Sequence, residues 1–256
     1  MQSFAHEMLR EIYEQPEALR HTLALYLAGK GLKPDVAGLL AGWPNPEGEI
    51  LIAASGSSRH SGLYAEILLE DVCGLAVDVE YASEYSSRGG LNLRHPSFLV
   101  LSQSGETSDT LAALSEACRR GQKTPAITNA AASTIAHQAD VSMPPAAGVE
   151  KAIPASKSFI CQLAVLYMLA LYVGARLGRM DTAALTAHVE ELKALPDKIE
   201  VQLDGWGGRW PTEHLLPIPE VVPLQLFSYF MALEHGVDVD RPRNLSKAVV
   251  EKASMV

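Results

Sequence analysis

The chain has 256 residues, of which 48% are hydrophobic and 20% are charged, as in ordinary globular proteins. Its formal net charge of −9 argues against a general nucleic-acid binder, which needs a basic face. An anionic small substrate is not excluded, because a local turn can supply positive potential.

The N-terminal segment is predicted to be helical. Residues 3–28 carry apolar side chains at helical spacing, and Pro16 interrupts them, so we expect two short helices or one kinked helix. A further helix is expected over residues 33–40, before a loop at residues 43–46 (WPNP). Residues 1–10 contain no apolar stretch of the signal-peptide type.

From residue 49 onward, short apolar runs alternate with segments of helical pattern. Helices are expected at residues 61–72 and 108–120, and strands at residues 49–54, 74–80, 97–102, 124–128 and 141–143. The runs are apolar throughout, which is typical of a parallel sheet covered on both faces. We therefore predict an α/β fold with a doubly wound parallel sheet flanked by helices.

Helices are predicted again after the sheet. Residues 156–177 form a long apolar helix that we expect to be buried, because its apolar run is too short for a bilayer, and residues 181–195 form a more polar helix. A boundary is expected at residues 205–211, a short strand at 215–218, a helix at 223–234 and a tail at 238–256.

The cysteines indicate the compartment. Cys73, Cys118 and Cys161 are far apart and form no metal-binding spacing, so we expect three buried thiols in a reducing environment and no metal site. No sequence feature indicates a cofactor.

We expect a cytoplasmic protein that does not bind a membrane, because residues 1–10 resemble no signal peptide and the apolar run is too short for a bilayer. We expect no binding of nucleic acid, because the net charge is negative.

Two serine-rich turns each follow a predicted strand and open a predicted helix. They are Ser55-Gly56-Ser57-Ser58 and Ser102-Gln103-Ser104-Gly105-Glu106-Thr107. Ligands of open parallel sheets bind beyond the carboxyl ends of the strands, where helix N-termini present N–H groups to a phosphate. The alternative is that the hydroxyl residues only cap their helices. Because two such turns follow neighbouring strands, we favour a phosphate site.

The second turn closely resembles the SIS (sugar isomerase) domain family, and more narrowly the isomerase part of glutamine–fructose-6-phosphate aminotransferases. Other segments resemble the same family in the same order, namely residues 8–16 (MLREIYEQP), 78–85 (DVEYASEY), 150–159 (EKAIPASKSF) and 222–247. The resemblance implies a flavodoxin-like SIS domain over residues 1–200. Residues 201–256 would be a linker and the C-terminal remnant, a helix and a tail, of a second SIS domain.

The resemblance also implies roles for single residues. Those that match the family's phosphate and sugar contacts are Ser58, Ser102, Gln103, Ser104 and Thr107. Lys247 matches a lysine that meets the open-chain sugar carbonyl and can form a Schiff base, which suits the nucleophilicity of an amine. Ala155 stands where the family usually has a sugar-contacting serine, so we expect one hydrogen bond fewer.

Much of the family's second SIS domain has no match in this chain, and neither has the glutaminase domain. The unmatched segments supply the family's glutamate and lysine near the sugar carbons and its ring-opening histidine. We therefore do not expect glutamine-dependent synthesis from this chain alone. Three explanations stay open: a deletion closed at residues 205–210, a homodimer that rebuilds the tandem pair, or a stretch of the protein absent from this sequence.

A sugar isomerase also needs a base within hydrogen-bond reach of the carbon whose proton moves. The candidates are Glu150, Glu106 and His60. Glu150 precedes the loop at the site and is the better carboxylate. Glu106 is expected to cap the turn, and His60 to be structural.

These observations predict a protein that acts on a hexose or hexosamine 6-phosphate. We expect an aldose–ketose isomerase or aminosugar-phosphate deaminase of the glucosamine 6-phosphate/fructose 6-phosphate type, with Lys247 and Glu150 as catalytic residues. The expected partners are a phosphorylated sugar and a second copy of the chain in a homodimer. Two alternatives are a non-catalytic sugar-phosphate-binding module that has lost its general base, and a carboxylate-dependent hydrolase or lyase on a sugar derivative.

Overall fold

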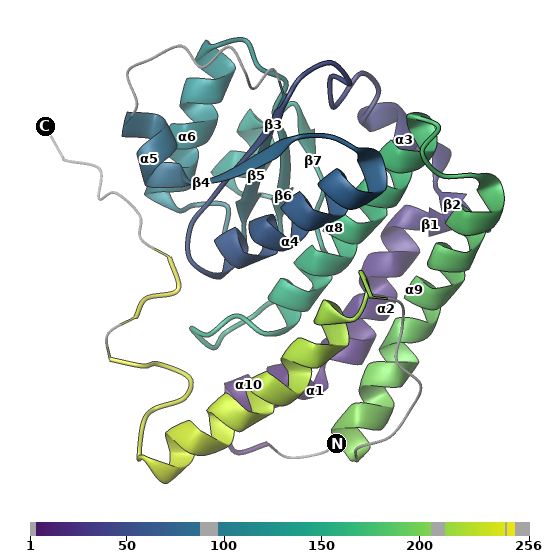
Figure 1. The fold of residues 1–256 in the computed structure, drawn as a ribbon. Coiled ribbons are helices and arrows are strands. Elements are labelled where there is room, and N and C mark those ends of the chain that lie inside the picture. The colour runs from purple at the N-terminus through teal and green to yellow at the C-terminus, as the bar shows by residue number, and fades with distance from the viewer. Residues whose placement is uncertain (1–3, 88–96, 206–212, 244, 249–256) are drawn as a thin grey trace, which may run out of the picture. The chain divides into compact units, whose positions relative to one another are not determined.

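A computed structural model describes residues 4–87, 97–205, 213–243 and 245–248 of the chain. The chain divides into two compact units (Figure 1). One, here the sheet unit, is built on residues 39–144 and also includes Lys247; the other, here the helical unit, is built on residues 1–38 and 145–246. The division predicted at residue 200 follows the family resemblance and stays a prediction.

The described residues of the sheet unit form five parallel strands. They are β3 (Ile50–Ala54), β4 (Val77–Tyr81), β5 (Ser97–Ser102), β6 (Pro125–Thr128) and β7 (Val141–Ser142). Their spatial order is β4-β3-β5-β6-β7, which is the flavodoxin-like order. The register pairs Ala54 with Leu101 and Ser102 with Thr128, so β3, β5 and β6 end at the same edge of the sheet. The predicted α/β fold with a parallel sheet is confirmed.

In the same described part of the chain, four helices accompany these strands: α4 (Ser57–Cys73), α5 (Ala82–Ser87), α6 (Ser108–Arg119) and α7 (Thr134–Gln138). Side chains of α5, α6 and α7 form one core with Leu51, Phe98 and Val100 of the sheet. α4 packs on the strands with the glycine Gly62, where a Cβ would lie 3.0 Å from Val79 Cγ1 and 3.3 Å from Ile52 Cγ2. Because side chains alternate along a strand, Ile52 faces away from Leu51, and the sheet is covered on both faces as predicted.

The helical unit contains the helices α1 (Glu7–Tyr13), α2 (Gln15–Tyr26), α8 (Lys157–Arg176), α9 (Thr182–Asp204) and α10 (Pro217–Glu234). It also contains an antiparallel hairpin of two short strands, β1 (Leu27–Ala28) and β2 (Gly31–Leu32). α3 (Pro34–Leu39) follows β2 in the chain. The expected break near Pro16 is confirmed, because α2 begins with this proline in its first turn. α8 is long and apolar enough to cross a membrane, but 83% of its apolar window is buried, as in the core helix of a soluble protein.

Two predictions for the C-terminal helices are wrong, and both errors involve proline. α9 does not end at Leu195 but continues through Pro196 to Asp204, because Leu195 and Ile199 remain buried on the same side of the helix. The strand expected at residues 215–218 does not form; α10 begins at Pro217, and a proline is tolerated in the first helical turn because its missing N–H would have no partner there. The boundary expected at residues 205–211 lies, apart from Gly205, outside the described residues.

The cysteine prediction holds for two residues. Cys73 and Cys161 are buried, and burial raises the pKa of the Cys161 thiol to about 12. Cys118 is exposed, so the expectation of three buried thiols is wrong. The helix α6 that carries Cys118 buries Leu114 and Ala117 instead, and position 118 falls on its outer side.

Candidate functional site

The turn after β5 is shaped by its own hydroxyl groups. The buried Ser102 Oγ accepts a hydrogen bond from the Gly105 N–H at 2.9 Å, and Ser104 Oγ accepts one from the Glu106 N–H at 3.2 Å. The hydroxyls of Ser104 and Thr107 lie 3.4 Å apart. A hydroxyl that accepts a bond can still donate its proton, so this turn gathers several donors directly before α6. Gln103 is half-buried in the same turn.

Gly105 is the tightest point of this turn. Its φ is +67°, which favours glycine, and a Cβ on it would lie 2.0 Å from Ser133 Oγ and 2.7 Å from Thr128 Oγ1. Thr128 ends β6, and Ser133 is the N-cap of α7. The turn after β5 therefore packs directly on the turn after β6.

Two further contacts join the same turns. The Gly105 carbonyl accepts a hydrogen bond from the Ile135 N–H at 3.1 Å. The Glu106 carboxylate accepts bonds from the N–H and the hydroxyl of Thr134, both at 2.8 Å. Glu106 thus binds the start of α7, and its carboxylate is engaged there. Sequence reasoning missed this third turn, although Ser133-Thr134 after a buried strand is a signal for a helix start.

Neither α4 nor α6 begins with a side-chain cap. The N-cap of α4 is Gly56, and the side chain of Thr107, the N-cap of α6, makes no capping bond. Ser133 and Asp181 cap α7 and α9 with their side chains, whereas the N-cap residues of α8 and α10 make no such bond either. Helix capping at the N-cap position therefore does not account for the hydroxyl-rich turns before α4 and α6. Long helices that start in this way at the carboxyl edge of a parallel sheet suit an anion.

The start of α4 adds a cation that the sequence reasoning missed. Ser58 is buried in the first turn, where its carbonyl accepts a bond from Ser61 Oγ at 2.7 Å. Arg59 follows it, and its guanidinium carbon lies 4.2 Å from the ring centroid of Tyr81, which ends β4. A basic residue directly after a serine-rich turn was the available signal. His60 is exposed at the next position.

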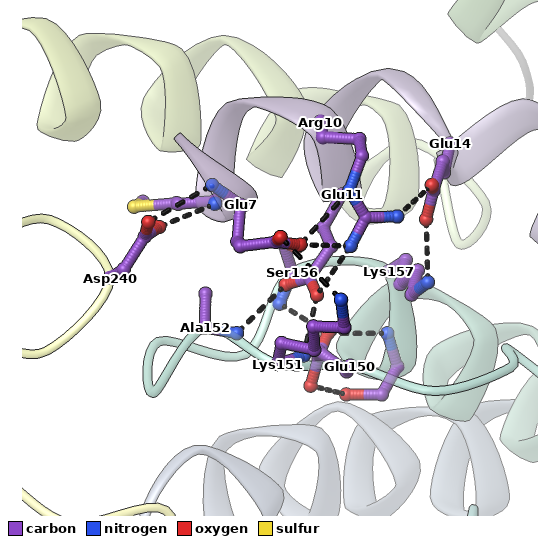
Figure 2. A network of polar contacts seen from close by, with 12 residues as sticks. Glu7, Arg10, Glu11, Glu14, Glu150, Lys151, Ala152, Ser156, Lys157 and Asp240 are labelled. Carbon is purple, nitrogen blue, oxygen red and sulfur yellow. Dashed lines mark hydrogen bonds and ion pairs between the residues drawn. The ribbon is translucent and has the colours of Figure 1, made fainter. Parts of the chain in front are cut away.

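Glu150 lies in the helical unit, where its carboxylate is fully engaged (Figure 2). Oε1 accepts bonds from the N–H groups of Ser156 at 3.0 Å and Ser158 at 3.1 Å, and Oε2 accepts one from the Ser158 hydroxyl at 2.6 Å. These donors begin α8, so Glu150 caps this helix from six residues upstream. The geometry gives Glu150 a structural task, and its catalytic role stays a prediction.

A second buried carboxylate holds the same loop. The fully buried Glu11 of α1 accepts bonds from the N–H groups of Lys151 at 2.5 Å and Ala152 at 3.3 Å (Figure 2). Burial raises the pKa of the Glu11 carboxyl, and the two N–H donors partly oppose this effect. Residues 150–152 are thereby fixed from one side by Glu11 and from the other by the start of α8.

Asp240 joins the C-terminal segment to this network. Its carboxylate accepts bonds from the N–H groups of Glu7 at 3.0 Å and Met8 at 2.7 Å at the start of α1. Its carbonyl accepts the Ile153 N–H at 2.9 Å. The segment that leads toward Lys247 is therefore attached to α1 and to the loop before α8.

The predicted site residues fall into two groups. The sheet unit carries the phosphate-contact candidates Ser58, Ser102, Gln103, Ser104 and Thr107, and it also includes the half-buried Lys247. Ser102 to Thr107 form one turn, and the register places Ser58 after the neighbouring strand β3. Glu150 belongs to the helical unit. The role of each residue in binding or catalysis stays a prediction.

Comparisons with known proteins identify the family of this chain. The SIS domain family model matches residues 45–172. Glutamine–fructose-6-phosphate aminotransferase [isomerizing] of Symbiobacterium thermophilum is 42% identical over 197 residues, which are 76% of this chain and 32% of that protein. The enzyme of the same name from Halobacterium salinarum is 36% identical over 202 residues, 78% of this chain and 34% of that protein.

Two solved structures are also similar. The C-terminal domain of glucosamine-fructose-6-phosphate aminotransferase from Francisella tularensis has a TM-score of 0.72 at 29% identity and covers 79% of this chain and 56% of its own. Glucosamine-6-phosphate deaminase from Thermotoga maritima has a TM-score of 0.67, and the match covers 96% of this chain and 100% of the deaminase. At 18% identity, this likeness shows the fold alone. This chain spans about a third of the length of the curated relatives. The family match, the five-stranded sheet and the serine-rich turn establish that the chain belongs to the SIS domain family, with its resemblance to the isomerase part of the aminotransferases.

Proposed function

We propose that the chain binds the phosphate of a hexose or hexosamine 6-phosphate at the turn Ser102–Thr107 and at Ser58. The observation that carries this proposal is the pair of long helices, α4 and α6, that start without a side-chain cap after adjacent parallel strands. Arg59 supports it by adding positive charge to the first turn of α4. Gln103 would contact the sugar or its phosphate from the same turn.

The SIS family comprises phosphosugar isomerases and deaminases. We propose that this chain catalyses a reaction of that kind on glucosamine 6-phosphate or fructose 6-phosphate in the cytoplasm. The Lys247 amine would attack the open-chain carbonyl carbon and release water to form a Schiff base. A base would then move a proton between the two carbons next to that bond. We also propose that the chain forms a homodimer, in which the second copy would bring its own side chains to the reaction.

A binding module without catalysis is the second candidate, and one observation favours it. Both oxygens of Glu150, the better candidate base, are engaged by the start of α8. Glu106 is engaged in the same way by Thr134. These bonds commit the two carboxylates to holding the starts of α8 and α7. They also leave a hydrolase or lyase that depends on Glu150 without support.

Binding is tested with the double variant Ser104→Ala/Thr107→Ala. Two lost charge-assisted hydrogen bonds should weaken fructose 6-phosphate binding by about 2–3 kcal/mol, or roughly 30–150-fold. The matched control is Ser115→Ala/Thr186→Ala, which removes the hydroxyl of an exposed serine in α6 and that of a half-buried threonine in α9. Equal affinities of the two double variants in calorimetry would remove the turn from the site.

Catalysis is tested by incubating the chain with glucosamine 6-phosphate and, separately, with fructose 6-phosphate. Ammonia and the sugar phosphates are followed by NMR, with Lys247→Ala and Glu150→Gln in parallel. Turnover that disappears in Lys247→Ala supports the enzyme. Turnover that persists in Glu150→Gln would show that a residue other than Glu150 is the base. Binding without turnover supports the module.

A further inference from the structure

An acidic residue stands inside the turn that is proposed to bind the phosphate. In the chain, Glu106 lies between Ser104 and Thr107, two of the proposed phosphate contacts. Its carboxylate carries a negative charge, and a negative charge beside a phosphate opposes binding. Attraction of the phosphate therefore gives no reason for a glutamate at this position, and the reason must lie in its other contacts.

The carboxylate of Glu106 binds the first residue of α7. Oε1 accepts a hydrogen bond from the Thr134 N–H and Oε2 accepts one from the Thr134 hydroxyl, both at 2.8 Å. Hydrogen bonds to a charged acceptor are stronger than neutral ones, and two of them to one residue also fix the orientation of the side chain. Both oxygens of Glu106 are thereby used at the start of α7.

The main chain of Glu106 belongs to the phosphate turn itself. Its N–H donates to Ser104 Oγ at 3.2 Å. The Ser104 hydroxyl in turn lies 3.4 Å from that of Thr107, the N-cap of α6. Glu106 is thus held by α7 through its side chain, while its backbone adjoins both hydroxyls. A change in where Glu106 is held would therefore displace the two proposed phosphate contacts.

The residues on either side of Thr134 make α7 a firm support for this contact. Ile135 is fully buried in the core of the sheet unit, and its N–H donates to the Gly105 carbonyl at 3.1 Å. Ser133 is buried as well and packs against Gly105. Thr134 itself is exposed and Glu106 is half-buried. The Glu106 side chain therefore ties a partly exposed turn to a segment that is anchored in the core.

We propose that Glu106 is a positioning residue of the phosphate site, which holds the hydroxyls of Ser104 and Thr107 in their binding positions through its bonds to Thr134. This inference rests on the proposed phosphate binding at the turn Ser102–Thr107, and it adds a residue that does not itself contact the ligand. Replacement of Glu106 by alanine removes a negative charge beside the phosphate and should nevertheless weaken binding. A glutamate without this role would have the opposite effect, because loss of its charge would favour the phosphate.

Two substitutions of Glu106 separate the bonds from the charge. Glu106→Ala loses both, and it should weaken binding of fructose 6-phosphate by about 5–10-fold, a moderate effect because Thr134 is exposed. Glu106→Gln loses only the charge, since its amide oxygen can accept the Thr134 N–H and its NH₂ group can donate to the hydroxyl. This variant should bind at least as tightly as the wild type. Calorimetric titration of the full chain with fructose 6-phosphate measures each affinity.

Asp109→Ala is the matched control for the loss of charge. Asp109 is exposed in the first turn of α6, and within the described residues its carboxylate makes no hydrogen bond or ion pair. Its removal should leave the affinity for fructose 6-phosphate unchanged or raise it.

Thr134→Val tests the other side of the same contact. It removes the hydroxyl bond but keeps the N–H bond, so it should weaken binding of fructose 6-phosphate by about 2–3-fold. Added to Glu106→Ala, it should have no further effect, because the contact between the two residues is already lost.

Circular dichroism establishes that each variant is folded. A folded Glu106→Ala that binds fructose 6-phosphate as tightly as the wild type would overturn the inference, and so would a Glu106→Gln as weak as Glu106→Ala. If Glu106→Ala does not fold, wild-type affinity in Thr134→Val overturns it instead. These results would leave the proposed function standing, because the wild type binds. A wild type that binds neither fructose 6-phosphate nor glucosamine 6-phosphate would overturn the proposed function, and this inference with it.

Discussion

Gly105→Ala is predicted to damage the turn after β5 by steric overlap as well as by backbone strain. The φ of +67° costs an alanine about 1–2 kcal/mol. The new Cβ would also lie 2.0 Å from Ser133 Oγ and 2.4 Å from Ser133 Cβ, so the turn or the start of α7 must move. Overpacking of this kind costs about 1–3 kcal/mol, which gives a total of about 2–5 kcal/mol.

Gly121→Ala is the matched control, because Gly121 lies just beyond the other end of α6. Its φ is +73°, and a Cβ there would meet nothing within 4 Å, so this variant carries the strain without the overlap. In a chain of this size, each kcal/mol lowers Tm by about 2–4 °C. Gly105→Ala should therefore melt about 2–12 °C below Gly121→Ala.

The two variants separate packing from binding. Differential scanning calorimetry measures Tm, and titration with fructose 6-phosphate measures affinity for both. Equal Tm values would refute the steric reasoning about Gly105. A lower Tm with unchanged fructose 6-phosphate affinity would keep the packing argument but remove the turn from the proposed site.

Two further predictions concern the network around α1. Burial raises the pKa of Glu11, so its contribution to folding stability is fully present below the unfolded pKa and is lost as pH rises through the folded value. Urea unfolding between about pH 4 and 7 should accordingly depend less on pH in Glu11→Gln, and an unchanged slope would contradict this. Asp240→Ala removes the two bonds that cap α1 and should cost about 0.5–2 kcal/mol in urea unfolding, whereas a wild-type midpoint would show that these bonds contribute little.

The fold could be predicted largely because the central strands β3, β5 and β6 are buried on both faces. Continuous apolar runs such as residues 97–102 then mark the strands, and the serine-rich turns mark where they end. The helix limits near Pro196 and Pro217 could not be predicted in the same way. Proline is a local signal, whereas continued burial of Ile199 and the position of Pro217 in a first turn depend on packing.

The geometry of the candidate site was predictable where it is local. The turn Ser102–Thr107 is a contiguous motif, and its internal bonds follow from neighbouring residues. The contact of Gly105 with Ser133 joins residues on different turns, so only the strand register reveals it. The bonds of Glu150 could not be predicted either. The sequence shows its carboxyl group, but the hydrogen-bond donors that contact it depend on how the loop before α8 folds.

In the proposed reaction, phosphate binding and chemistry are assigned to different residues, and kinetics can distinguish the two roles. The proposed phosphate contacts are hydroxyls and helix starts of the sheet unit, which hold a group that does not react. Such contacts stabilise the ground state and the transition state alike, so Ser104→Ala/Thr107→Ala should raise KM and leave kcat nearly unchanged. Lys247 would act on the carbonyl carbon, so Lys247→Ala should reduce kcat while the affinity for fructose 6-phosphate stays close to that of the wild type. If both variants lowered kcat equally and left KM unchanged, the turn would belong to the reacting part of the site instead.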